Sequence, residues 1–210
     1  MPKLSPTPAV SVVPEAESTL KPQLLIPCEP HYREEGVQYF PDIAAIKARQ
    51  NVERVQIFDE FSNAILAAQS RVWIIDKRIL SDDGKKPKHN QRLEKVSNWF
   101  RDTDQLKSVR ILTGAPPDQN EALDVFSDLS KEVTDRRGPL YPPLDAQIKF
   151  TINKFPYIHD RFAIIDDELW HFGATVGGFH RHVNAASRGW DVNAHRAIDF
   201  FEMAWKGLSD

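Results

Sequence analysis

The residues best suited to chemistry lie between positions 157 and 175. His159, Arg161 and Asp166 form the pattern His-x-Arg-x4-Asp, and Gly173 and Thr175 follow shortly after. An imidazole changes its charge near neutral pH, so it can act as a nucleophile or as an acid. A guanidinium offers a planar fork of donors that matches phosphate oxygens. Together with an orienting carboxylate, these groups could attack a phosphodiester without a metal ion.

The spacing also predicts how a strand would present these groups. Residues 159–165 are expected to form a strand, in which His159 and Arg161 share one face and lie roughly 6.5–7 Å apart. One phosphate could then contact both. Asp166 lies at the strand end, where a turn could fold it back toward a ring nitrogen or a cation. Gly173 and Thr175 would bring backbone N–H groups and a hydroxyl from the next strand.

The same residues could instead have a purely structural role. Arg161 and Asp166 could form a salt bridge at the strand end, which contributes little at a surface. His159 could be an exposed polar residue that precedes a buried strand.

The surrounding pattern predicts an α/β domain. Helical periodicity favours helices, and short apolar runs favour strands. The expected helices are 51–69, 91–102, 119–135 and 194–206, and the expected strands are 72–75, 109–112, 146–152, 159–165, 169–172 and 188–192. Helices that alternate with buried strands are typical of a sheet covered on both faces.

The run His159-x-Arg161-x4-Asp166-x6-Gly173-x-Thr175 resembles the signature of the phospholipase D superfamily, His-x-Lys-x4-Asp followed by a Gly-Ser/Thr element. The order of elements over residues 45–206 fits one such domain. The resemblance implies a phospholipase D-like domain, a mixed β-sheet with helices on both faces. It also implies metal-independent phosphodiester hydrolysis through a phosphohistidine, without a cofactor.

The resemblance assigns a role to each motif residue. His159 would be the nucleophile or the general acid, and Arg161 the phosphate clamp. Asp166 would orient a histidine or support the clamp. Thr175, within the Gly173 element, would bind phosphate or orient the substrate.

Two departures from the signature bear on function. Arg161 replaces the usual lysine, and the chain carries one motif where a complete site in this family needs two. Small members of the family join two motifs in a homodimer, whose C2 interface is self-complementary. We therefore expect either a hydrolase whose site is shared across a homodimer, or a catalytically inactive module that binds nucleic acid or phosphate within a larger assembly.

The polar segment after residue 178 could extend the site. Arg181 and Arg188 could contact a nucleic-acid backbone, although a solvated loop would have the same composition. His180 and His182 have a spacing that could chelate a metal. No acidic or cysteine residue lies at a recognisable ligand spacing from them, so we expect no metal site.

Composition sets the remaining expectations. The chain has 210 residues, of which 41% are hydrophobic and 27% charged, with a net charge of −3 that does not exclude a local basic cleft. No apolar run approaches a membrane span, and no basic amphipathic helix is evident. A cytoplasmic protein that acts on nucleic acid rather than lipid, and has no membrane partner, is the resulting expectation.

The N-terminal region differs from the rest. Seven of the fifteen prolines lie in residues 1–30, so residues 1–40 are predicted to be a disordered tail and residues 41–210 the domain. The patch Leu24-Leu25-Ile26 could still dock on the domain or on a partner. Cys28 is the single cysteine, so no disulfide can form within the chain.

Overall fold

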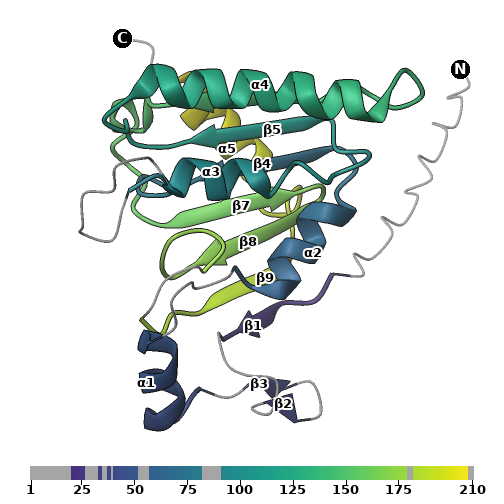
Figure 1. Ribbon diagram of the computed structural model, residues 1–210. Coiled ribbons are helices and arrows are strands. Elements are labelled where there is room, and N and C mark those ends of the chain that lie inside the picture. The colour runs from purple at the N-terminus through teal and green to yellow at the C-terminus, as the bar shows by residue number, and fades with distance from the viewer. Residues whose placement is uncertain are drawn as a thin grey trace, which may run out of the picture.

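A mixed seven-stranded sheet forms the centre of the protein. A computed structural model describes residues 20–26, 33–34, 37–38, 40–51, 57–81, 91–178 and 182–207. The strands lie in the order β1-β9-β8-β7-β4-β5-β6 (Figure 1). Three of them run parallel, namely β4 (Arg71–Ile75), β5 (Ser108–Leu112) and β6 (Asp145–Lys149). The other four, β7 (Arg161–Ile165), β8 (Glu168–Phe172), β9 (Ala186–Asp191) and β1 (Gln23–Leu25), are joined by antiparallel pairing.

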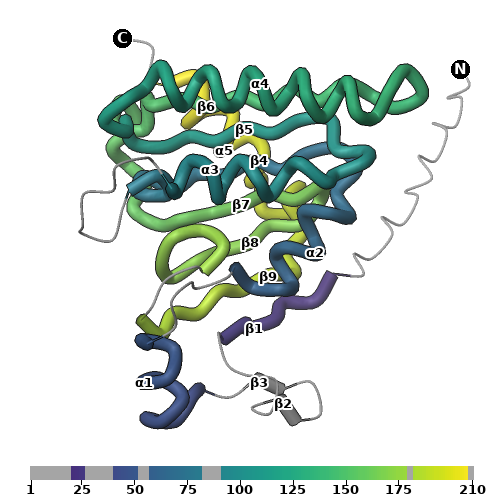
Figure 2. The backbone as a smooth tube through the Cα atoms, in the orientation of Figure 1, coloured from purple at the N-terminus to yellow at the C-terminus, as the bar shows by residue number. Residues whose placement is uncertain are grey.

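Helices cover both faces of this sheet. On one face lie α2 (Asp59–Ala67), α3 (Gln91–Asn98) and α4 (Gln119–Arg137), and on the other lies α5 (Ala197–Lys206) (Figures 1 and 2). The helix α1 (Ile43–Asn51) and the hairpin of β2 (Arg33–Glu34) and β3 (Val37–Gln38) lie beyond the β1 edge (Figure 1). The predicted α/β class, with a mixed sheet and helices on both faces, is confirmed.

Alternation along the strands divides the apolar side chains between two cores. In β4, Val72 and Ile74 face α2, α3 and α4, whereas Trp73 and Ile75 face α5. A strand that is covered on both faces needs apolar residues at successive positions, and residues 72–75 of β4 are accordingly all apolar. The same alternation places Ala163 and Ile165 of β7 in the first core and Ile164 in the second.

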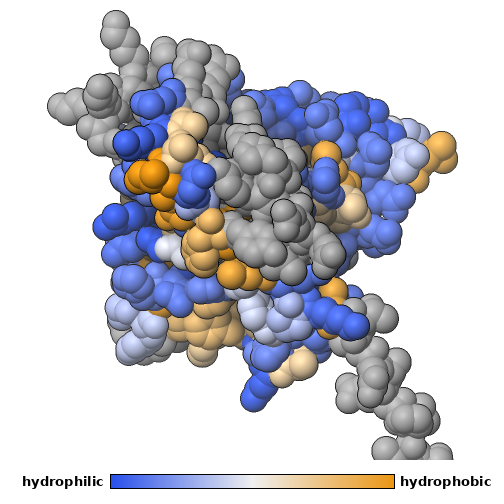
Figure 3. Space-filling model, turned by 90° about the horizontal axis from the view of Figure 1, so that it is seen from below, coloured by the Kyte–Doolittle hydropathy of each residue, from blue (hydrophilic) through white to orange (hydrophobic). Residues whose placement is uncertain are grey.

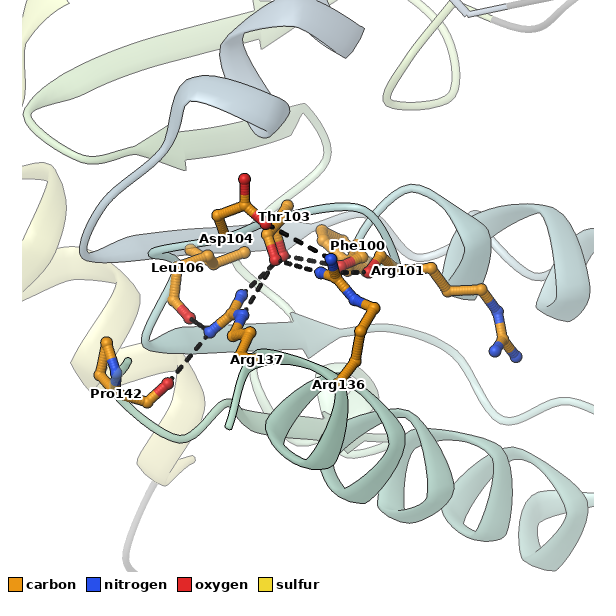
Figure 4. A network of polar contacts seen from close by, with 8 residues as sticks. All are labelled: Phe100, Arg101, Thr103, Asp104, Leu106, Arg136, Arg137 and Pro142. Atoms are coloured by element: carbon orange, nitrogen blue, oxygen red, sulfur yellow. Dashed lines mark hydrogen bonds and ion pairs between the residues drawn. The ribbon is translucent and has the colours of Figure 1, made fainter. Parts of the chain in front are cut away.

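A buried arginine fixes the end of α4 (Figure 4). Arg137 donates to the carbonyl and the hydroxyl of Thr103 at 2.9 Å, to the carbonyl of Leu106 at 2.7 Å and to that of Pro142 at 3.2 Å. Four satisfied hydrogen bonds offset the cost of removing the guanidinium from water. The contacts hold the loop before β5 against the helix, and thereby the position of the parallel strands.

The structure corrects the predicted tail boundary at residue 40. Residues 23–25 form β1, which pairs with β9 at the sheet edge, and Leu25 and Ile26 are buried. Residues 24–26 thus pack on the domain, one of the two alternatives expected for them. Gly189 permits the pairing of β1 with β9, because its φ is +93° and a Cβ at this position would lie 2.0 Å from the carbonyl oxygen of Lys21. Residues 1–19 and Cys28 lie outside the described residues.

Most predicted elements are found near their expected positions. Several bounds differ: β7 begins at Arg161 rather than at His159, α3 ends at Asn98 rather than at 102, and β6 ends at Lys149 rather than at 152. α5 begins at Ala197 rather than at 194, and α2 begins at Asp59, after residues 52–56 that lie outside the described ranges. Within those ranges, no helix combines the length and apolar character needed to cross a bilayer.

Candidate functional site

His159 lies just before the first residue of β7 and projects into solvent. Its side chain is 96% exposed, and its Nδ1 is 3.5 Å from a carboxylate oxygen of Asp160. Within the described residues, no hydrogen bond or ion pair joins it to Arg161. The expected strand geometry does not apply at this position, because β7 starts two residues later. The imidazole is thus accessible to solvent.

Arg161, in contrast, is held in place. Its Nη1 donates to the carbonyl oxygen of Gly173 at 3.3 Å, and its Nε lies 3.8 Å from an oxygen of Asp76. Its side chain is 23% exposed, so part of the guanidinium still faces solvent. A cation that is anchored on one side and open on the other can receive a phosphate oxygen with little loss of side-chain entropy.

The anchor Asp76 is a site residue that the motif did not reveal. It follows β4 directly, is fully buried, and accepts hydrogen bonds from the backbone N–H groups of Arg78 at 2.8 Å and Val176 at 2.9 Å. Burial raises the pKa of the Asp76 carboxyl, although these two N–H groups and the guanidinium of Arg161 act in the opposite direction. A carboxylate immediately after the apolar run 72–75 was the available signal, because polar residues at the carboxyl ends of parallel strands often serve a site.

The turn after β8 carries the predicted phosphate ligands. Gly173 donates its N–H to the carbonyl of Ala185 at 2.9 Å, and Thr175 is buried, with its carbonyl accepting from the N–H of Gly178 at 3.0 Å. Gly178 has a φ of +70°, and a Cβ there would overlap the ring of Phe58 at 2.0 Å. The structure therefore brings Gly173 to Arg161 and places Thr175 in a fixed turn that Asp76 binds through Val176.

Asp166 lies at the opposite end of β7 from His159, and the proposed orienting role is wrong on geometry. Its carboxylate accepts hydrogen bonds from the N–H groups of Gln69, Ser70 and Arg71 and from the Ser70 hydroxyl, at 2.7–3.0 Å. Burial opposes ionisation of Asp166, but these four bonds outweigh it and lower its pKa. Asp166 joins β7 to the start of β4, and a five-residue strand separates it from the candidate nucleophile.

Arg188, one of the two arginines predicted to contact a nucleic-acid backbone, makes an ion pair on β9. Arg188 makes two hydrogen bonds of 2.7 Å to the carboxylate of Glu168, and its guanidinium lies over the ring of Trp170 at 4.3 Å. These contacts anchor Arg188 on β9 through its Nε and one Nη, and its role toward a substrate stays a prediction. Arg181 lies outside the described residues. No group of three or more metal-ligating side chains is found in the part of the chain that the structure describes.

Three groups with chemical potential lie at the N-terminal end of β7: the restrained guanidinium of Arg161, the exposed imidazole of His159 and the rigid turn after β8. The cation and the turn are brought together through Asp76, while the imidazole stands apart on the same strand end. Among the described residues, the His159 side chain has one polar contact, that with Asp160, and it is 96% exposed. Hydrogen bonds in a ligand-free site are often longer than in the complex.

Comparison with known proteins gives fold likenesses only. No family model and no curated protein sequence matches the chain. NucT from Helicobacter pylori matches 90% of this chain and 97% of its own, with 12% identity and a TM-score of 0.48. TrmBL2, described as an archaeal chromatin protein with a novel mode of DNA binding, matches over 74% of this chain and 53% of its own, with 12% identity and a TM-score of 0.39. Phosphatidylserine synthase from Haemophilus influenzae Rd KW20 matches over 74% and 39%, with 13% identity and a TM-score of 0.40. At these identities and TM-scores, none of the three transfers a residue role to this chain.

Proposed function

We propose that the protein is a phospholipase D-like, metal-independent phosphodiester hydrolase that acts on nucleic acid. The observation that carries the proposal is the end of β7, where an exposed His159 stands two residues before a guanidinium anchored by Asp76 and Gly173 and still partly open to solvent. The resemblance of the motif to the phospholipase D signature supplies the reaction type. Nucleic acid is favoured over lipid because the sequence shows no apolar anchor and no basic amphipathic helix.

In this proposal Nε2 of His159 attacks phosphorus while Arg161 binds the non-bridging oxygens. The bond from phosphorus to the leaving oxygen breaks, and a phosphohistidine forms. Water then attacks the phosphohistidine and releases the free imidazole. Arg161 is preorganised for its part because Asp76 and Gly173 hold it before the substrate arrives.

The leaving oxygen needs a proton, and one motif supplies one imidazole. A C2 homodimer, as the resemblance implies, would provide the partner subunit's His159 as the donor. The exposure of His159 is compatible with such an approach. The mass of the native protein tests whether a dimer forms.

The face seen from below carries both hydrophobic and hydrophilic side chains. In the part of it that the described residues form, the two kinds lie among one another (Figure 3). The elements at this edge, β1 and α1, contribute exposed Leu24 and Ile43 (Figure 1). Residues scattered in this way are ordinary on a protein surface.

The second candidate is a catalytically silent module that binds a nucleic-acid backbone or a phosphate. It is favoured by the engagement of Arg161 with Asp76 and by the absence of a contact between His159 and Arg161. This candidate predicts binding without turnover, with binding lost in Arg161→Ala and retained in His159→Ala.

The deciding experiment is cleavage of labelled single- and double-stranded oligonucleotides in excess EDTA. The hydrolase predicts cleavage that persists in EDTA and is abolished in His159→Ala. His195→Ala is the matched control, because His195 is also exposed and lies after β9, away from the motif. Oligonucleotide binding with no product in the wild-type protein would reject the hydrolase and support the module.

A further inference from the structure

The segment that leads into β7 is anchored at two positions and exposed beside them. Phe155 is 3% exposed and packs edge to face against Phe200 of α5, with ring centroids 5.7 Å apart, and Ile158 packs against the same core. Tyr157, which lies between these anchors, is 74% exposed, and the His159 side chain is 96% exposed. The anchors hold the segment on the domain, while the phenol and the imidazole project into solvent.

Tyr157 is restrained although it is exposed. Its ring contacts that of Phe155 edge to face, with centroids 5.6 Å apart and an angle of 87° between the ring planes. Such a contact favours one orientation of the ring, and a tyrosine has only two χ angles to immobilise when it binds a ligand. A single exposed aromatic residue is ordinary on a protein surface. This one is notable because it lies two residues from the proposed nucleophile.

The length of the chain limits the distance between Tyr157 and the proposed phosphate site. A fully extended chain places the Cα atom of Tyr157 at most about 7 Å from that of His159 and about 14 Å from that of Arg161. A base that stacks on the ring need not point toward the phosphorus, because it belongs to a nucleotide beside the scissile bond. The phenol and the guanidinium can therefore bind different parts of one strand, even from different sides of the end of β7.

Cations stand on both sides of Tyr157 in the sequence. Lys154, the last residue of the short helix η2 (Ile152–Lys154), is exposed, and Arg161 follows four residues after the tyrosine. The one acidic residue of positions 154–161, Asp160, has a carboxylate oxygen 3.2 Å from Nε2 of His171. Proteins that bind single strands combine cations that follow the backbone with aromatic rings on which the bases stack. The segment has this composition.

We propose that Tyr157 is a stacking platform for a nucleobase and that the substrate is single-stranded nucleic acid. This inference rests on the proposed hydrolase function. In a duplex the neighbouring base pairs cover both faces of each base, so the ring can stack only on an unpaired one. Every base has a π-face, so the platform binds without sequence preference. Lys154 binds a backbone phosphate beyond the stacked base. Tyr157 takes no part in the reaction, so proton donation by the partner subunit's His159 is unaffected.

The experiment compares three labelled ligands in excess EDTA: a single-stranded oligonucleotide, its duplex, and a strand of the same length built from stable abasic residues. Binding is measured in the His159→Ala background, so that turnover does not interfere, and cleavage is measured with His159 in place. Tyr157→Ala should weaken binding of the ordinary strand by about 5–150-fold and leave binding of the abasic strand unchanged. Tyr157→Phe keeps the ring and should bind like the parent protein.

The matched control is Tyr141→Ala. Tyr141 is also exposed, but it precedes β6, and the strand pairing places the start of β6 at the opposite end of the sheet from Arg161. This variant should bind all three ligands like the parent protein. The salt dependence separates the two contacts of the segment. Lys154→Ala should reduce the slope of log affinity against log salt concentration by about 0.7, whereas Tyr157→Ala should leave that slope unchanged.

Binding and cleavage together distinguish failure of the platform from failure of the proposed function. Unchanged binding of the ordinary strand in Tyr157→Ala would overturn the platform, and so would an equal loss on the ordinary and abasic strands, which would indicate a structural effect. Tighter binding of the duplex than of the single strand would overturn the substrate assignment. Cleavage of both strands that Tyr157→Ala leaves unchanged would refute the platform and retain the hydrolase. Binding that depends on Tyr157, without cleavage of either strand by wild type, would refute the hydrolase and retain the platform.

Discussion

Replacement of Asp166 should destabilise the protein without removing its chemistry. Of the four hydrogen bonds that the carboxylate accepts, the one from Gln69 is exposed and can be replaced by water, which leaves three partly buried bonds from Ser70 and Arg71. At about 1 kcal/mol net for each partly buried bond, these contribute about 3 kcal/mol. Asp166 also has a φ of +51°, which an alanine side chain tolerates poorly and which adds about 1 kcal/mol.

We therefore expect Asp166→Ala to lower the free energy of unfolding by about 3–4 kcal/mol. Asp166→Asn keeps an acceptor oxygen for all three partly buried bonds, which end on one carboxylate oxygen, and it tolerates a positive φ, so it should lose only about 1 kcal/mol, as should Ser70→Ala. Urea unfolding of these three variants, and of the double variant with Asp166→Ala and Ser70→Ala, gives the interaction free energy between Ser70 and Asp166. Cleavage, measured at a temperature where each variant is folded, should stay within a few-fold of wild type.

The pH dependence follows from the lowered pKa of Asp166. A carboxyl whose pKa is lower in the folded state stabilises the fold above its unfolded value, near 3.8, and loses that contribution as the pH falls through the folded value. The stability difference between wild type and Asp166→Asn should thus narrow in acid. A loss of less than about 1 kcal/mol in Asp166→Ala, or abolished cleavage in a fully stable Asp166→Asn, would refute the assignment of Asp166 to the fold.

Three further predictions concern single contacts. Burial raises the pKa of Asp76, so ionisation of this carboxyl opposes folding. The free energy of unfolding of wild type, measured with urea, should therefore fall relative to that of Asp76→Asn as the pH rises from 4 to 8, by at most about 1.4 kcal/mol per pH unit. A difference that instead grows in favour of wild type would show that the ion pair with Arg161 outweighs burial. Gly189→Ala should detach β1, which hydrogen exchange at Leu24 and Leu25 would report as lost protection, and unchanged exchange would contradict the close approach to Lys21. Arg137→Met should cost about 3–5 kcal/mol, because it leaves the carbonyls of Leu106 and Pro142 without their donor; a melting temperature equal to that of wild type would show that water replaces these bonds.

The sequence predicted the fold where apolar periodicity is strong. The runs at 72–75, 109–112 and 169–172 became β4, β5 and β8; residues 72–75 are buried on both faces, whereas the polar residues Arg110 and His171 of the other two are partly exposed. β1 could not be predicted in this way. Three residues flanked by proline carry too little pattern, and the pairing with β9 depends on a glycine more than 160 positions away.

The site was predicted in part for a related reason. Gly173 lies beside Arg161, since the hairpin between β7 and β8 fixes their register, but its carbonyl contacts the guanidinium and its N–H, expected to face a phosphate, is donated to Ala185. Asp76 follows β4 and reaches Arg161 only through the lateral pairing of β4 with β7, which no local spacing encodes. Asp166 was misassigned because spacing along one strand cannot say to which end of the sheet a carboxylate turns.

The pairing of β1 with β9 has a practical consequence for shortened forms of the protein. Removal of the residues up to Leu25 would leave the backbone N–H and C=O groups on one side of β9 without partners and would uncover apolar surface beside Ala186. An open strand of this kind is a template for another strand, whether from a second copy or from an aggregate. A truncation intended to trim the proline-rich region should therefore end before Leu20, and one that ends after Leu25 should yield material that self-associates.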